Sequence, residues 1–164
     1  MWHRIACASL LVILSWGQLA YAAPVTADPA QVKGLLDTLH QPAKKSRMRP
    51  GSDGFIRFVG TAPDNHFVVN TPASSSPEDV ARQFLTDHEA AFTSKSLHTN
   101  YILRRTSRSH GNSFVHVGQT YMGLDVFGSG MVIQVNEQGG VACVVSDLLR
   151  DTTPLETGAV PVTA

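Results

Sequence analysis

An alternating stretch between residues 113 and 146, interrupted by glycine-containing turns, constrains the fold of this chain more than any other feature. In its first run, the residues that share a face are Val115, Val117, Gln119 and Tyr121. In its second run, they are Phe127, Ser129, Met131, Ile133 and Val135. A third run covers 141–146. Side chains alternate between the faces of a β-strand, so this period predicts antiparallel strands joined at 122–125 and 137–140.

Two segments carry the start signals of α-helices. Asp28 can cap a helix whose first position is Pro29, and apolar residues with helical spacing follow, so we expect a helix at about 29–40. The Ser76 hydroxyl can accept a hydrogen bond from the Asp79 backbone, and the next residue is again a proline. We expect this second helix at 77–93, with its apolar face packed on the sheet.

Three further runs have strand character. Residues 55–59 and 66–69 flank the turn sequence 61–65, which predicts a hairpin, and another run covers 101–106. The expected fold class is therefore α+β: an N-terminal helix followed by an antiparallel sheet of three or more strands with one packed helix.

A basic segment precedes the first of these runs. Lys44, Lys45, Arg47 and Arg49 place four positive charges within six residues, bounded by Pro42 and Pro50. The segment is typical of a solvated linker. It would also suit a protease that cleaves after lysine or arginine, and the sequence alone leaves both interpretations open.

The N-terminus has the organisation of a secretory signal peptide. Arg4 supplies a positive charge, the apolar run 5–16 is too short to span a bilayer, and Ala20 and Ala22 form a small-x-small cleavage pattern. We expect cleavage after Ala22 or one residue later, the alternative being an uncleaved anchor. The processed chain would keep one cysteine, Cys143, which lies among apolar residues and is expected to be buried and unreactive.

The sequence contains no pattern that predicts catalysis. His88-Glu89 begins like the zinc-binding HExxH motif, but Phe92 stands where the second histidine is required, so His88 is interpreted as a partly buried helix residue. The segment Gly128-Ser129-Gly130 lacks the spacing of a nucleophile elbow. We therefore expect no catalytic residue, no metal site and no cofactor.

The charge balance gives no reason to expect a polyanionic partner. Lysine plus arginine and aspartate plus glutamate each number 13, so electrostatics indicate neither nucleic acid nor an anionic membrane.

Residues 114–148 resemble the FTP domain, the fungalysin/thermolysin propeptide module. The resemblance rests on a glycine-punctuated motif followed by two strands and a Gly139-Gly140 turn, and a helix similar to 76–92 commonly precedes it. The motif residues, also the expected partner contacts, are Gln119, Thr120, Tyr121, Gly123, Val126, Phe127 and Gly128. The chain departs from the family pattern at His116, Gly118 and Asp125.

The resemblance implies a noncatalytic module from the prosegment of a secreted zinc metallopeptidase. Such modules inhibit the peptidase, assist its folding, and are usually followed by a PepSY domain and a catalytic domain with HExxH. The expected partner is thus a thermolysin- or fungalysin-like peptidase domain, in cis or in trans. Tyr121 and Phe127 could be contacts to that partner, or could belong with Met131 and Ile133 to this domain's own core.

The expected organisation has four parts: signal peptide 1–22, helix and basic linker 23–50, FTP-like domain 51–152, and linker or truncated tail 153–164. The alternative function is a stand-alone extracellular interaction module that has lost its peptidase. A zinc enzyme would need a second ligand that the sequence does not offer.

Overall fold

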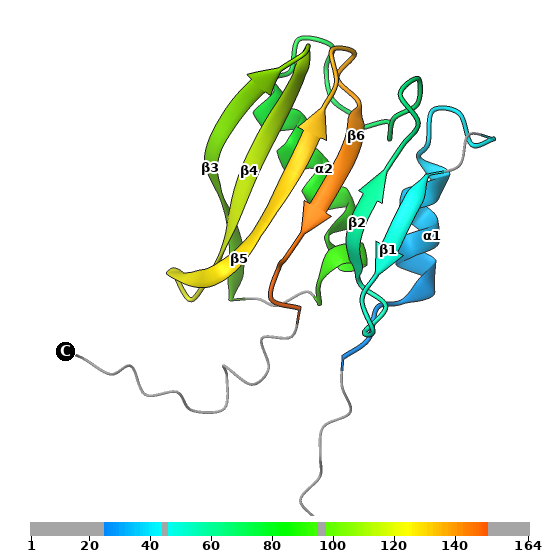
Figure 1. Ribbon diagram of the computed structural model, residues 1–164. Coiled ribbons are helices and arrows are strands. Elements are labelled where there is room, and N and C mark those ends of the chain that lie inside the picture. Colours follow the sequence, from blue (N-terminus) through cyan, green and yellow to red (C-terminus); the bar gives the residue numbers. More distant parts are fainter. Residues whose placement is uncertain (1–24, 44–45, 95–97, 151–164) are drawn as a thin grey trace, which may run out of the picture.

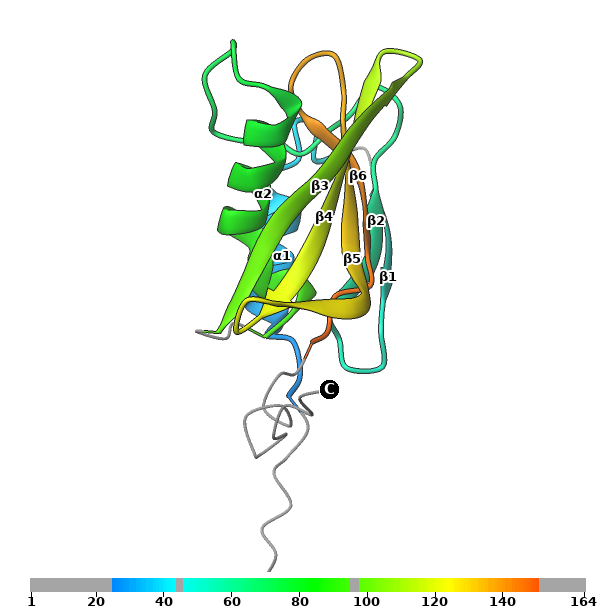
Figure 2. The same cartoon turned by 90° about the vertical axis from the view of Figure 1, so that its left-hand side faces the viewer.

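A six-stranded antiparallel sheet with two helices against one face forms the protein (Figures 1 and 2). The computed structural model describes residues 25–43, 46–94 and 98–150. The helices are α1 (Pro29–Asp37) and α2 (Pro77–Phe92). The strands are β1 (Arg47–Pro50), β2 (Ile56–Gly60), β3 (Thr99–Ser109), β4 (Asn112–Tyr121), β5 (Leu124–Val135) and β6 (Val141–Ser146), in the sheet order β1-β2-β6-β5-β4-β3. The expected signal peptide and tail lie outside the described residues.

Both helices begin at the caps that the sequence indicates. The Asp28 carboxylate accepts a hydrogen bond of 2.9 Å from the Ala30 backbone, and the Ser76 hydroxyl accepts one of 3.1 Å from Asp79. Helix α1 ends earlier than expected, because Thr38 donates its hydroxyl proton to the Leu35 carbonyl and the chain then leaves the helix. Neither helix in the described ranges is long and apolar enough to cross a membrane.

The core lies between the helices and one face of the sheet. Helix α2 buries its apolar stripe, including Phe84 and Phe92, against alternate residues of the central strands. Those strand residues are Val115, Val117, Met131, Ile133, Val135 and Val144. Helix α1 also contributes the fully buried Leu35, so the α+β class and the antiparallel sheet are confirmed, while one packed helix was too few.

The expected hairpin between 55–59 and 66–69 is wrong. The second of these segments forms only an isolated bridge through Phe67, which pairs with Leu39 on one side and Val141 on the other. Phe67 is fully buried, and its ring lies 6.1 Å from that of Phe84. The segment is thus held by the Phe67 side chain and by backbone hydrogen bonds to residues 38–40 and 141, and it does not pair with β2.

The strand that pairs with β2 comes from the basic segment. Residues Arg47–Pro50 form β1, and Met48, the one half-buried member of the strand, lies opposite Val59. The two arginines are exposed at the edge of the sheet. In the described chain, this segment is therefore an edge strand; Lys44 and Lys45 lie outside the described residues.

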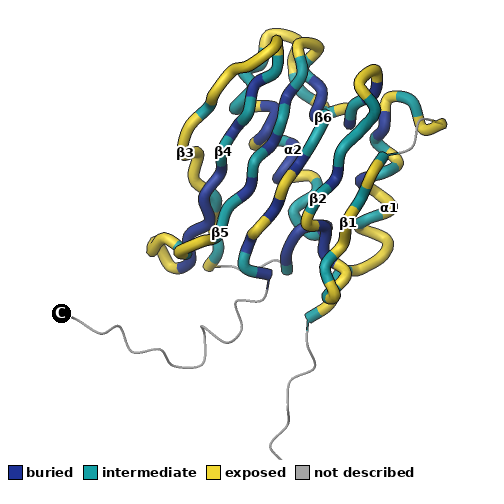
Figure 3. Tube along the Cα trace, in the orientation of Figure 1, coloured by how far each residue is buried: buried dark blue, intermediate teal, exposed yellow. Residues whose placement is uncertain are grey.

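The second face of the sheet has no helix over it in the described part of the chain (Figure 2). The side chains of β4 that point to this face belong to the even-numbered residues, because the odd-numbered ones enter the core. The face is half-buried along its centre, and exposure increases toward β3 (Figure 3). The sheet therefore has one covered face and one open face.

Candidate interaction surface

The β4–β5 hairpin closes through the two residues Met122 and Gly123. Tyr121 pairs with Leu124 across the turn, and φ is positive at both turn residues, at 50° and 81°. Positive φ at both central positions defines the turn type whose twist suits a hairpin, and glycine adopts it without steric cost. The turn leaves Met122 and Leu124 exposed at the end of the sheet.

Strand β5 bulges strongly just after this turn. Gly118 pairs with Gly130 and Thr120 with Asp125, so one residue on β4, Gln119, lies opposite the four residues 126–129 on β5. Gly128 has a φ of 72°, which permits the bend. The extra residues change the phase of the strand, and the Phe127 side chain is 103% exposed. The expectation that Phe127 shares the core face of Met131 and Ile133 is therefore wrong.

Three exposed apolar side chains gather on this short hairpin. Met122, Leu124 and Phe127 are each exposed by more than half, and together they are called the turn surface below. The ion pair between Arg104 of β3 and Asp125 links the hairpin to the neighbouring part of the sheet. Large exposed aromatic and thioether side chains carry much of the binding energy in protein interfaces, so the turn surface has the composition of a docking site.

The first half of the expected site has a different environment. Gln119 is 1% exposed, and its side-chain amide donates to the Leu149 carbonyl at 3.0 Å. Its carbonyl oxygen accepts from the Leu149 backbone at 2.7 Å and also from the Ser129 hydroxyl. The Gln119 side chain thus binds both the C=O and the N–H of Leu149, in the segment that follows the last strand.

This last segment, residues 147–150, is called the exit segment and is held by several elements. The Thr93 hydroxyl at the end of α2 donates to the Leu149 carbonyl at 2.9 Å, and the Ser94 backbone N–H donates to the Arg150 carbonyl at 3.0 Å. The buried Arg150 guanidinium donates to the carbonyls of Leu148 and of Ser146, the last residue of β6, and its Nε lies 3.4 Å from the Asp53 carboxylate. The chain therefore leaves the domain from a defined position, beside the β4–β5 hairpin (Figure 1).

The remaining motif residues divide between these two environments. Thr120 is buried and donates its hydroxyl proton to the Asn100 carbonyl at 3.3 Å, and Tyr121 is buried with its ring edge-on to His98. Gly123 and Gly128 are exposed and Val126 is half-buried. Seven residues expected to form one contact surface are thus split into a buried group at 119–121 and a more exposed group at 123–128.

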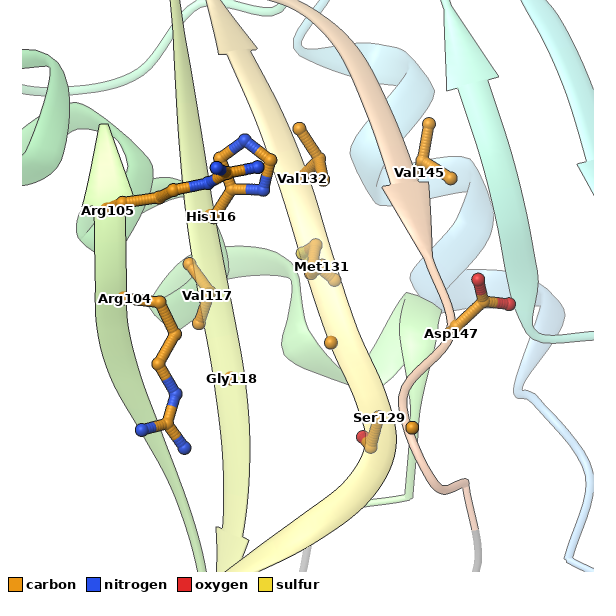
Figure 4. A pocket seen from close by; sticks show the side chains of 12 residues that line it. Arg104, Arg105, His116, Val117, Gly118, Ser129, Met131, Val132, Val145 and Asp147 are labelled. Carbon is orange, nitrogen blue, oxygen red and sulfur yellow. The ribbon is translucent and has the colours of Figure 1, made fainter. Parts of the chain in front are cut away.

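A shallow hollow of about 390 Å³ lies on the open face beside the hairpin (Figure 4). Its floor contains the facing pair Gly118 and Gly130. A Cβ added at Gly118 would lie 2.4 Å from Nε of Arg104, whose guanidinium crosses this position toward Asp125. Gly118 therefore makes room for an internal ion pair.

The histidine and cysteine side chains considered for catalysis pack within the fold. His88 is half-buried with its ring 5.0 Å from Phe84, and burial lowers its pKa. Cys143 was expected to be buried but is half-buried, and desolvation raises the pKa of its thiol, which reduces the thiolate fraction. Within the described ranges, no three His, Cys, Asp or Glu side chains are grouped to hold a metal ion.

Comparison with protein families supports the resemblance. Residues 100–147 match the sequence model of the family described as Fungalysin/Thermolysin Propeptide Motif. The match covers strands β3 to β6 almost entirely and leaves out both helices. Searches among curated proteins and solved structures found no match. Residues 100–147 therefore carry an FTP propeptide motif, which is not a catalytic domain.

Sequence reasoning missed several residues of this region. The two-residue Met122-Gly123 turn could have been located from the glycine and from the strand patterns on each side. Its position would have indicated that Met122, in the turn, and Leu124, directly after it, are exposed. The partners Leu149 and Arg150 had no local signal, because their contacts come from residues about 30 to 57 positions away.

Proposed function

We propose that this chain is a noncatalytic, exported propeptide-type module that binds a thermolysin- or fungalysin-like metallopeptidase domain. Binding keeps the peptidase inactive and assists its folding. The observation that carries the proposal is the match of residues 100–147 to the propeptide motif. The signal-like N-terminus supports export, and the partner is either joined to this chain or separate from it.

The turn surface is the proposed contact to the peptidase. Met122, Leu124 and Phe127 lie within the matched segment and expose apolar area that the domain's own core does not use. Apolar anchors at the centre of an interface contribute most of its affinity. The buried residues Gln119 and Thr120 support this contact indirectly, since Gln119 binds the exit segment and Thr120 binds the Asn100 carbonyl of β3.

The test measures inhibition and refolding with one set of proteins. The exported chain is added at micromolar concentration to a thermolysin- or fungalysin-type peptidase from the same organism, and the initial rate on a fluorogenic peptide is followed. The same peptidase, unfolded in denaturant, is diluted with and without the chain to measure recovered activity. We expect slower hydrolysis and a higher refolding yield.

Two exposed positions provide the matched variants. Phe127→Ala should weaken inhibition, whereas Val68→Ala, at another exposed apolar residue far from the hairpin in sequence, should not. Full peptidase activity and an unchanged refolding yield in the presence of the wild-type chain would contradict the proposal. That result would favour the alternative, an extracellular interaction module without a peptidase partner.

A further inference from the structure

In the part of the chain that the structure describes, the sheet ends in two edge strands, β1 and β3, which differ in length and chemistry. Strand β1 has four residues and ends in Pro50, which lacks a backbone N–H. Strand β3 has eleven residues, contains no proline, and is the outermost strand on the other side (Figures 1 and 2). An edge strand directs alternate N–H and C=O groups outward, and these can pair with another extended chain. Strand β3 therefore offers the longer template, with one register shift against β4 between Leu103 and Arg105.

The β3 edge combines exposed aliphatic side chains with positive charge. Ile102 and Leu103 are 43% and 40% exposed, and the strand carries three arginines and no acidic residue. Arg104 is already paired with Asp125. Neither Arg105 nor Arg108 has a described carboxylate within ion-pair distance. Two cationic side chains of this edge are thus available to a partner.

These two arginines project on opposite sides of the sheet. Arg105 lies opposite His116 of β4 and points to the open face, as Figure 4 shows. Arg108 lies opposite the buried Ser113 and therefore points to the helix side. Glu78 of α2 is close enough to Arg108 to interact electrostatically, although not as an ion pair. A strand added at this edge would meet Arg105 on the open face, and Arg108 with Glu78 nearby on the helix side.

We propose that the β3 edge, residues 99–109, binds an acidic extended segment of another protein as an additional antiparallel or parallel strand of the sheet. Backbone hydrogen bonds to β3 would provide the pairing, and carboxylates of the partner would lie beside Arg105 and Arg108. Ile102 and Leu103 would contact apolar side chains of the partner. This surface is separate from the turn surface, and the inference stands whether or not the partner is a peptidase.

Charge favours an acidic partner over a second copy of this chain. Antiparallel pairing of β3 with β3, or of β3 with β1, would bring arginines of both strands together, since β1 also carries two arginines and no carboxylate. Like charges that face each other across strands are destabilising, and opposite charges contribute roughly 0.2–1 kcal/mol per pair. The arginines therefore disfavour self-association and complement an acidic strand at the same edge.

The test uses a blocked, fluorescent octapeptide, Glu-Val-Glu-Thr-Val-Glu-Val-Glu, and two readouts. Anisotropy measures its affinity at low and high salt, and amide chemical shifts of the isotope-labelled protein locate the binding site. Two control peptides replace either every glutamate by lysine or every valine by proline. We expect binding of the acidic peptide only, weaker at high salt, with shifts concentrated in residues 99–109.

Charge-reversal variants test whether Arg105 and Arg108 form the binding site. Arg105→Glu with Arg108→Glu should weaken the affinity roughly tenfold, because two attractive cross-strand pairs become repulsive. The matched pair Arg47→Glu with Arg49→Glu on β1, and Phe127→Ala on the turn surface, should leave it unchanged. If the reversed β3 variant does not fold, Arg105→Gln with Arg108→Gln should still weaken binding about threefold.

Four results would overturn the inference. Equal binding of the acidic and lysine peptides would remove the role of charge. Equal binding of the proline peptide would show attraction without strand pairing. Shifts centred on Met122 and Phe127, or equal loss in the β1 variant, would place the site elsewhere. None of these results bears on peptidase inhibition, which is tested separately with Phe127→Ala.

Discussion

Residues 119–121 and residues 122–128 belong to one continuous motif but have opposite environments. The first group is buried and uses its side chains to hold neighbouring backbone. The second group turns, bulges and exposes Met122, Leu124 and Phe127. Side chains of the two groups are separated by only a few residues, yet one group stabilises the domain and the other is offered to solvent.

The difference shows that a motif can combine two physical tasks. Gln119 is matched by fixed donors and acceptors, so its identity is set by hydrogen bonding within the domain. Phe127 has no such internal requirement, because its side chain is fully exposed. Substitutions in the first group should therefore change folding, and substitutions in the second should change binding.

The largest effect is expected from Gln119→Ala. The change removes two hydrogen bonds to the Leu149 backbone, which keeps its bonds to the Ser129 and Thr93 hydroxyls, and it leaves a cavity at a buried site. Together these losses should lower the free energy of unfolding by about 3 kcal/mol. Urea denaturation measures the loss. Gln134→Ala, at a half-buried glutamine of β5, is the matched control and should cost less than about 0.5 kcal/mol. Equal losses in the two variants would contradict the role given to Gln119.

Phe127→Ala should show the reverse pattern. We expect the free energy of unfolding to change by less than about 0.5 kcal/mol, since the ring contacts little of the domain. Affinity for the peptidase should fall about 30-fold, or about 2 kcal/mol, as for an aromatic anchor at an interface. An inhibition constant and a urea midpoint measured on the same sample separate the two effects. A large loss of stability would show that Phe127 belongs to the fold after all.

A smaller effect is expected at the bulge that exposes Phe127. Gly128→Ala places a Cβ at a φ of 72° and should destabilise the domain by about 1 kcal/mol, although the space around it is open. Gly34→Ala is the matched control, because Gly34 lies within α1 with no positive φ and no atom near a new Cβ. This second change should increase stability by up to about 1 kcal/mol. Thermal unfolding of both variants checks the opposite signs.

The smallest effect is expected from pH, and it concerns the stability of the domain more than binding at the turn surface. Burial lowers the pKa of His66, with the stacked His40 adding to the effect, and burial also lowers the pKa of His88. The unfolded chain therefore binds more protons than the folded one as pH falls below about 6.5. Stability should be complete above this pH and decline below it.

A matched pair of histidine variants makes the pH prediction specific. His66→Asn and His88→Asn should each reduce the slope of stability against pH between neutral and mildly acidic conditions, because burial lowers the pKa of both side chains. Urea titrations at several pH values supply the slopes. Identical slopes for wild type and His66→Asn would show that other groups govern the acid response.

The sequence was sufficient where local patterns decide the structure. Period-two alternation located β4, β5 and β6, and the Ser76-Pro77 start located α2 to within one residue of its end. Prediction from the sequence failed where a single distant contact outweighs the local pattern. Phe67 is held by bridges to Leu39 and Val141, so its segment is not a strand, and Arg47–Pro50 becomes one because β2 provides a partner.

The sequence located the candidate site but did not show that it divides into a buried group and an exposed group. The glycines at 123 and 128 indicated turns, yet nothing local shows that four residues of β5 face one of β4 and that the strand therefore changes phase. The buried role of Gln119 also depends on a segment 30 residues later in the chain. Both features arise from pairing between strands, which a strand's own residues do not specify.

The hydrogen bonds around the exit segment have a mechanical consequence. Tension applied to the chain beyond Arg150 would load the bonds from Gln119, Thr93 and Ser94 before it reached the sheet. These bonds come from β4 and from the end of α2, so the load would be shared between the sheet and the helix layer. A pull on this side of the molecule would thus be borne in part by Gln119, which lies on the strand that leads into the exposed turn.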